Sequence, residues 1–280
     1  MRAGVHQKVA RSYPLYWFYS TLVLIIWFCK PEMVNSVQDN QVNILASFLI
    51  LPQDLLPLVM VGWTLVHEMY FYIVIAVLML IIPERTLPVF LVLWALVVII
   101  GSSCFIADLG GDYNSTMQVA LHPLTLDFIG GVAIALLVNC NARKGEYLII
   151  GIGISVFLFS VIWLNIHDSV LKTEGWWRIS LFGIPSFLVV YGAVRVEISR
   201  KICFPKIMRK MGDASYSIYL SHVLVLSAIG RVWAKLAISG VIVHAVIIAT
   251  MILTTIIVGL MSYRWIELPV LNKIRTWRMQ

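Results

Sequence analysis

The stretch Gly62–Tyr72 reads Gly-Trp-Thr-Leu-Val-His-Glu-Met-Tyr-Phe-Tyr and leads directly into the apolar run from Ile73 to Ile82. A charged side chain inside a lipid-spanning helix costs roughly 2.5–3.5 kcal/mol on insertion scales. Glu68 therefore needs polar neighbours, and at helical spacing Thr64 and Tyr72 lie one turn before and after it. Two interpretations stay open: Glu68 faces a protein-lined cavity, or it lies at headgroup level in a helix end bordered by Trp and Tyr.

The composition predicts an integral membrane protein. Of the 280 residues 60% are hydrophobic and 12% are charged, and the mean hydropathy is +0.91. Soluble proteins average about 45–50% apolar and about 25% charged residues. The net charge of +7 arises from basic residues in short loops between apolar runs, which is typical of topology determinants and argues against a nucleic-acid partner. The four cysteines show no metal-ligand spacing, so we predict no metal site.

The apolar runs predict a helix bundle. Roughly 20 helical residues cross a hydrocarbon core of about 30 Å. By this measure we expect about eight transmembrane helices, at 14–29, 60–82, 89–107, 119–138, 147–164, 179–194, 213–229 and 241–263. The first and the sixth are short, and the apolar stretch 43–53 is too brief to cross. The predicted fold is all-α: a polytopic integral membrane helix bundle that forms a single domain over residues 1–280.

The distribution of basic residues predicts the orientation of the bundle. If the N-terminus is inside, most of the Lys and Arg residues fall in the inner segments, with the densest group between Arg195 and Lys210. Positive charge is concentrated on the cytoplasmic side of membrane proteins, so both termini are predicted to be cytoplasmic. Residues 263–280 alternate apolar and basic side chains, which predicts an amphipathic cytoplasmic tail on the membrane surface, interrupted at Pro269.

Glycine pairs predict where helices approach closely. Gly130-Gly131 and the pair Gly151/Gly153 lie inside predicted spans. Small residues let helix backbones come together in a membrane, so we expect helix contacts at both pairs.

A second polar stretch, Met211–His222, reads Met-Gly-Asp-Ala-Ser-Tyr-Ser-Ile-Tyr-Leu-Ser-His. At helical spacing Ser215, Tyr219 and His222 fall on one face. Aligned polar groups on a membrane helix are typical of a helix that lines an aqueous cavity. A hydrogen-bonded core histidine is the alternative for His222. The other histidines to which no function is assigned are His6, His122, His167 and His244.

A third stretch, Tyr263–Pro269, reads Tyr-Arg-Trp-Ile-Glu-Leu-Pro. Arg264 and Glu267 lie three residues apart and can pair on one helix face. Such a pair contributes only a few tenths of a kcal/mol when exposed, so a structural latch is the predicted role.

These three stretches resemble the signatures of the membrane acyltransferase-3 family, which acylates sugars and other surface molecules. The residues that carry the resemblance are Trp63-Thr64-Leu65-x-x-Glu68-x-x-Phe71-Tyr72, Gly212-x-x-Ser215-Tyr216-x-x-Tyr219-Leu220-x-His222 and Tyr263-Arg264-x-x-Glu267-x-Pro269. The basic stretch Lys8–Trp17, with its Pro14-Leu15-Tyr16-Trp17, is similar to the family's entry to its third helix.

The resemblance implies a membrane-bound O-acyltransferase that moves an acetyl group from acetyl-CoA to a hydroxyl of a cell-surface polysaccharide such as O-antigen. It implies acetyl-CoA, or another acyl-CoA, as donor substrate, no bound cofactor, and a polysaccharide or lipid-linked sugar as acceptor. The location it implies is the inner (plasma) membrane, in contact with membrane lipid. The residues it implicates are Glu68 and His222 in catalysis, Arg11, Trp63, Tyr72, Ser215 and Tyr219 in substrate or donor binding, and Arg264 and Glu267 in structure.

The sequence departs from the family pattern at its beginning. The family starts with two more helices, the first of which carries an Arg and a His that is the prime catalytic candidate. This chain starts at the third helix, so we expect it to lack the family's best general base. An inactive, N-terminally truncated remnant is therefore one alternative. A small-molecule transporter or flippase is another, although such proteins usually show inverted repeats or broken helices, and this sequence shows neither.

Overall fold

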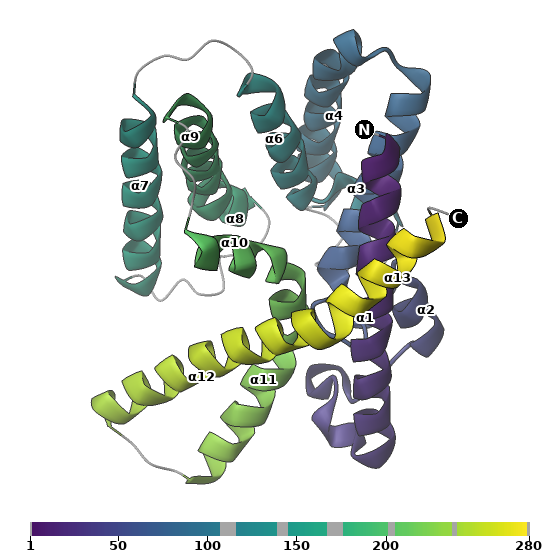
Figure 1. Ribbon diagram of the computed structural model, residues 1–280, viewed down its shortest axis with the longest axis vertical. Coiled ribbons are helices and arrows are strands. Elements are labelled where there is room, and N and C mark those ends of the chain that lie inside the picture. Colours follow the sequence, from purple (N-terminus) through teal and green to yellow (C-terminus); the bar gives the residue numbers. More distant parts are fainter. Residues whose placement is uncertain are drawn as a thin grey trace. The chain divides into compact units, whose positions relative to one another are not determined.

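The computed structural model describes residues 2–106, 116–138, 145–166, 176–200, 205–236 and 240–278 (Figure 1). Every regular element in these ranges is a helix, which confirms the all-α prediction. The elements up to residue 106 are α1 (Arg2–Cys29), η1 (Pro31–Met33), η2 (Ser36–Gln38), α2 (Ile44–Leu49), α3 (Gly62–Ile81), η3 (Glu84–Thr86), α4 (Leu87–Gly101) and η4 (Ser102–Ile106). Those that follow are α5 (Thr116–Leu121), α6 (Leu124–Leu137), α7 (Glu146–Ile166), α8 (Trp176–Arg178), η6 (Ile179–Gly183), α9 (Ile184–Arg200), α10 (Lys206–Asp213), α11 (Ser215–Leu236), α12 (Val241–Ser262), η7 (Tyr263–Glu267) and α13 (Leu268–Arg278).

The described residues form a multi-pass membrane protein. Six helices are long and apolar enough to cross a membrane: Gly62–Ile81, Leu87–Cys104, Glu146–Ile166, Trp176–Ser199, Ser215–Leu236 and Ile242–Lys273. The shorter apolar helices Tyr13–Cys29 and Leu124–Leu137 coincide with the first and fourth predicted spans. The sixth predicted span is not short, because the π-helical turn η6 joins α8 to α9 without a break.

The chain divides into two compact units. The first contains Met1–Val66 and Pro205–Gln280, and the second contains His67–Phe204. The division falls inside helix α3, between Val66 and His67.

In the first unit, α1 packs against α11 and α13, and α11 pairs with α12 (Figure 1). Helix α1 is held to α2 by two aromatic side chains: Tyr16 donates to the carbonyl oxygen of Ser47, and Trp17 donates to that of Phe48, each at 2.9 Å. The α11–α12 pair is tight because α12 presents a glycine. A Cβ on Gly259 would lie only 2.7 Å from the Cα of Ile218, so no larger residue fits there.

The predicted interruption at Pro269 is wrong. Helix α12 continues through the π-helical turn η7 into α13, and Pro269 is the second residue of α13. Proline is tolerated inside a membrane helix where a local π-helical adjustment accommodates it, and the π-helical turn η7 directly precedes Pro269. The tail therefore begins as a continuation of the last span, and Glu267 becomes part of the buried interior.

In the second unit, α3, α4 and α6 pack around Phe71. Its ring stacks on Trp94 of α4 at 5.5 Å between centroids and on Phe128 of α6 at 5.0 Å. Leu87, Leu91 and Ile129 complete this buried cluster.

The predicted glycine contacts are half right. A Cβ on Gly130 of α6 would meet the ring of Phe187 at 2.5 Å, and one on Gly153 of α7 would meet the carbonyl oxygen of Pro185 at 2.9 Å. Gly131 and Gly151 have no such neighbour within 4 Å. One glycine of each pair therefore faces helix α9, which is the packing that the small residues permit.

Candidate functional site

The first turn of α3 is fixed to α11 by a pair of hydroxyl groups. The hydroxyls of Thr64 and Tyr219 are hydrogen-bonded to each other. Both also reach the carbonyl oxygen of Val61, Thr64 at 2.8 Å and Tyr219 at 3.3 Å. Tyr219, predicted to bind substrate, is thereby held in a fixed position, and Trp63 lies half-buried in the same turn of α3.

His222 is held by the backbone of its own helix. Its Nδ1 lies 2.5 Å from the carbonyl oxygen of Tyr219, one turn earlier in α11. A carbonyl oxygen only accepts, so this contact requires the hydrogen on Nδ1. In the neutral ring the lone pair is then on Nε2, which is the atom that can take a proton. His222 is half-buried, and its ring centroid lies 5.5 Å from that of Tyr219.

Glu68 has the partner that helical spacing predicts. Tyr72 donates its phenolic hydrogen to Glu68 Oε1 at 2.5 Å. Both side chains are half-buried. Thr64, the neighbour expected on the other side of Glu68, contacts Tyr219 and Val61. The carboxyl group of Glu68 accepts this bond with one oxygen, and its other oxygen is able to accept from a second hydroxyl.

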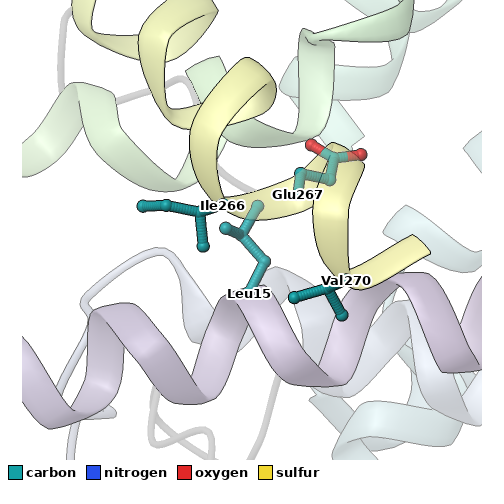
Figure 2. A pocket seen from close by; sticks show the side chains of 4 residues that line it. All are labelled: Leu15, Ile266, Glu267 and Val270. Carbon is teal, nitrogen blue, oxygen red and sulfur yellow. The ribbon is translucent and has the colours of Figure 1, made fainter. Parts of the chain in front are cut away.

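Glu267 lies in the buried interior of the first unit. It is 2% exposed, and its Oε2 accepts a hydrogen bond from Ser217 of α11 at 2.5 Å. Figure 2 shows Glu267 with Leu15, Ile266 and Val270, which line a crevice too narrow to hold a water molecule. Arg264 is exposed. The hydrogen bond between Ser217 and Glu267 therefore joins α11 to η7 in the interior of this unit.

We expect Ser217→Ala to lower the stability of the protein. The substitution leaves a buried carboxylate without one of its donors, which costs about 1–3 kcal/mol, or more for a charged group. The measurement is thermal unfolding of the detergent-solubilised protein, with Ser227→Ala as the control because Ser227 is an exposed serine of the same helix. If the two variants unfold at the same temperature, the Ser217–Glu267 bond does not stabilise this unit.

For two of the predicted binding residues, Ser215 and Arg11, the structure gives no side-chain contact that bears on their roles. Ser215 is the first residue of α11 and is exposed, whereas Ser217 and Ser221 are buried. Arg11 belongs to α1, but its side chain lies outside the described part of the structure. Within the described residues, no three His, Cys, Asp or Glu side chains gather in a way that would hold a metal ion. The roles assigned to Ser215 and Arg11 stay predictions.

A further group of polar side chains, absent from the sequence predictions, lies in the second unit. The rings of His67 and His122 meet edge to face at 4.8 Å between centroids. Asp127 of α6 places a carboxylate within an apolar helix. Like Glu68, Asp127 is a carboxylate in an apolar run, so the insertion cost that singles out Glu68 in the sequence also identifies Asp127.

The chain is similar in sequence to known proteins. Residues 2–263 match the model of an acyltransferase domain. The chain belongs to the acyltransferase-3 family. It is also 27% identical over 290 residues to the exopolysaccharide production protein ExoZ of Rhizobium meliloti (strain 1021), in an alignment that covers 98% of this chain and 83% of that protein. No solved structure matches it. The resemblance drawn from the polar stretches is thus confirmed.

For a member of the acyltransferase-3 family, the described groups have a chemical meaning. Transfer of an acyl group to a hydroxyl requires a group that accepts the hydroxyl proton and donors that stabilise the negative charge on the acyl oxygen. His222 has the tautomer of a proton acceptor. Glu68 is an acceptor for hydroxyl hydrogens.

Proposed function

We propose that this chain is an O-acetyltransferase of the inner membrane, which moves the acetyl group of cytoplasmic acetyl-CoA to a hydroxyl of a cell-surface polysaccharide such as O-antigen. The observation that carries the proposal is the family match over residues 2–263 of a multi-pass membrane protein. The relative in Rhizobium meliloti is named an exopolysaccharide production protein, which supports a polysaccharide or a lipid-linked sugar as acceptor.

In the proposed reaction, His222 takes the proton of the acceptor hydroxyl on Nε2. The hydrogen bond from Nδ1 to the carbonyl oxygen of Tyr219 supports this role, because it fixes the tautomer and the orientation of the ring. A positioned general base contributes typically about 10²–10⁴-fold to the rate. The proposal thus gives this chain a base of its own on α11.

The remaining roles follow from charge and position. Glu68, stabilised by Tyr72, accepts a hydrogen bond from a substrate hydroxyl. Trp63 and Tyr219 supply flat aromatic surface in the first unit, and Arg11 at the basic end of α1 pairs with donor phosphate. Ser215 contributes a hydroxyl at the start of α11.

The test is acetyl transfer in membrane vesicles of defined orientation. Inverted vesicles that contain the protein and its polysaccharide receive acetyl-CoA labelled in the acetyl group. We expect alkali-labile label in the polysaccharide, and less of it in sealed right-side-out vesicles, where the donor does not reach the cytoplasmic face. Vesicles without the protein are the control. If polysaccharide in inverted vesicles gains no more label than this control, the proposed activity is wrong and the remnant or transporter alternative stands.

A further inference from the structure

Helix α10 separates its basic side chains from its apolar side chains. An α-helix has about 3.6 residues per turn, which places the basic side chains of α10 on one face and the large apolar ones on the opposite face. The basic residues are Lys206, Arg209 and Lys210, and the apolar residues are Ile207, Met208 and Met211. Asp213 also falls on the basic face, which keeps a net positive charge. Helix α10 is therefore a short amphipathic helix with a basic face.

Helix α10 ends directly before a membrane span. Ala214 lies between α10 and α11 with φ −88° and ψ 1°, so the two helices are separate, and Figure 1 shows α10 bent away from the line of α11. The N–H of Ala214 donates to the carbonyl oxygen of Lys210 at 3.0 Å, and its own carbonyl oxygen accepts the N–H of Ile218 at 2.9 Å. Helix α11, which begins at Ser215, is long and apolar enough to cross a membrane. The end of α10 is thus tied to one end of a membrane span.

Helix α10 is too short to cross the membrane itself. Its 8 residues span about 12 Å at a rise of 1.5 Å per residue, whereas a hydrocarbon core of about 30 Å takes roughly 20 residues. An amphipathic helix beside a span lies along the membrane surface, because its apolar face then enters the acyl region while its basic face stays among the headgroups. Length and pattern together therefore predict that α10 lies on the membrane.

Both faces of α10 are exposed. On the apolar face Ile207 is 68% exposed and Met208 is 57% exposed. On the other face Lys206, Arg209 and Lys210 are exposed as well. Within the described residues, none of these three basic side chains has a hydrogen bond or an ion pair. Large exposed apolar side chains beside basic groups are typical of a surface that contacts lipid.

The charge of α10 selects among lipids. The helix lies at the end of the most basic stretch of the chain, between Arg195 and Lys210, which is predicted to be cytoplasmic. Anionic headgroups of the cytoplasmic leaflet attract basic segments that adjoin membrane spans. Lysine and arginine donate hydrogen bonds to phosphate oxygens, and the acyl chains of the same lipid are apolar partners for Ile207 and Met208. An anionic phospholipid therefore complements both faces of α10, whereas a soluble anion complements only the basic face.

We propose that α10 is a binding site for anionic phospholipid at the membrane surface. Lys206, Arg209 and Lys210 contact the phosphate groups, and Ile207 and Met208 insert between the acyl chains. The site lies within the first unit and is independent of the proposed acetyl transfer. Because α10 adjoins α11 directly, lipid bound to α10 holds the start of α11 at a fixed depth in the membrane.

The first test locates α10 relative to the membrane. Nitroxide spin labels are attached through Met208→Cys and, separately, Lys210→Cys, in the full chain with its four natural cysteines replaced by serine. Each protein is reconstituted into vesicles of phosphatidylglycerol and phosphatidylcholine. We expect the label at position 208 to be accessible to oxygen, which concentrates in lipid, and the label at position 210 to a water-soluble nickel chelate. If the two labels do not differ in this way, α10 does not lie on the membrane and the proposal is wrong.

The second test measures the lipid preference. The full chain in a neutral detergent is titrated with fluorescently labelled phosphatidylglycerol, and with phosphatidylcholine that carries the same label. A Lys or Arg near an anionic lipid surface contributes roughly a fivefold factor in affinity, so we expect phosphatidylglycerol to bind at least about tenfold more tightly. The combined variant Lys206→Gln, Arg209→Gln and Lys210→Gln should reduce this preference to about twofold or less, because the phosphate groups then lose their cationic partners.

The matched control removes the same charge elsewhere. The combined variant Lys30→Gln, Arg85→Gln and Lys235→Gln changes three exposed basic residues outside α10 and should keep the preference of the wild type. Thermal unfolding shows whether both variants are folded, and if the α10 variant is not, the spin labels alone decide. Equal losses of preference in the two variants, or an unchanged preference in the α10 variant, would overturn the proposal.

A soluble competitor separates a lipid site from a general anion site. Glycerol phosphate carries the phosphate group without acyl chains, so we expect it not to displace phosphatidylglycerol at equal concentration. Displacement would show that the basic face binds anions without help from the apolar face, and the lipid site would then be wrong. A wild-type chain that does not distinguish the two labelled lipids would also contradict it.

Discussion

Replacing His222 with alanine is expected to lower the rate of acetyl transfer by roughly 10²–10⁴-fold, the usual contribution of a general base. The reason is local geometry: Nδ1 is engaged by the carbonyl oxygen of Tyr219 at 2.5 Å, so Nε2 is the proton acceptor of the neutral ring. The loss should appear in kcat, because proton removal occurs in the transition state and not in substrate binding.

The measurement is initial-rate acetyl transfer in inverted vesicles at matched protein levels. His244→Ala is the control, since His244 is exposed and its ring lies beside Trp233 of α11 at 6.2 Å between centroids. We expect this control to retain wild-type activity. If His222→Ala transfers acetyl at a rate within about threefold of wild type, the loss is far smaller than the contribution of a general base, and another group is the base.

Glu68→Gln is expected to abolish measurable acetyl transfer while membrane insertion is unaffected. The substitution removes the negative charge and keeps the shape of the side chain, so only interactions that need a carboxylate are lost. A carboxylate in an apolar helix costs roughly 2.5–3.5 kcal/mol, and its neutral replacement should insert at least as well. Insertion measured by membrane fractionation and transfer measured by label in the polysaccharide separate the two effects.

Two further variants interpret this result. Tyr72→Phe removes only the hydroxyl that donates to Glu68 Oε1. A hydrogen bond to a charged group is worth about 1.5–3 kcal/mol, so we expect the rate of acetyl transfer to fall at least tenfold. Glu32→Gln, at an exposed position in η1, is the matched control for charge removal. Wild-type activity in Glu68→Gln would mean that Glu68 is a headgroup-level residue of the helix end.

The sequence predicts the helices well because the membrane makes the rule simple. Without water in the hydrocarbon core, each spanning segment satisfies its backbone hydrogen bonds within itself, so apolar runs of sufficient length become helices. The limits of these helices follow less directly. Proline at 269 suggests an end, yet the π-helical turn η7 carries α12 into α13 and the helix continues past the proline. Whether a proline ends a helix depends on the conformation of the turn before it, and local composition does not determine that conformation.

Within the candidate site, spacing along one helix is also readable from sequence. The contact between Tyr72 and Glu68 is an i,i+4 pair, fixed by helix geometry alone. Contacts between helices are not readable in this way. Thr64 bonds to Tyr219, which is far away in sequence, and the buried serine that reaches Glu267 is Ser217, on a different face of α11 from Ser215.

The sequence by itself determined the all-α membrane bundle, the positions of its apolar helices and the polar stretches that mark the family, since each depends on composition or on the helical repeat. Only the tertiary structure decided which polar groups meet: His67 with His122, Asp127 with the turn at Gly183, and Ser217 with Glu267. These pairs depend on the rotation and approach of separate helices, which are set by side-chain packing such as that of Phe71 on Phe128, and no local sequence pattern encodes that packing.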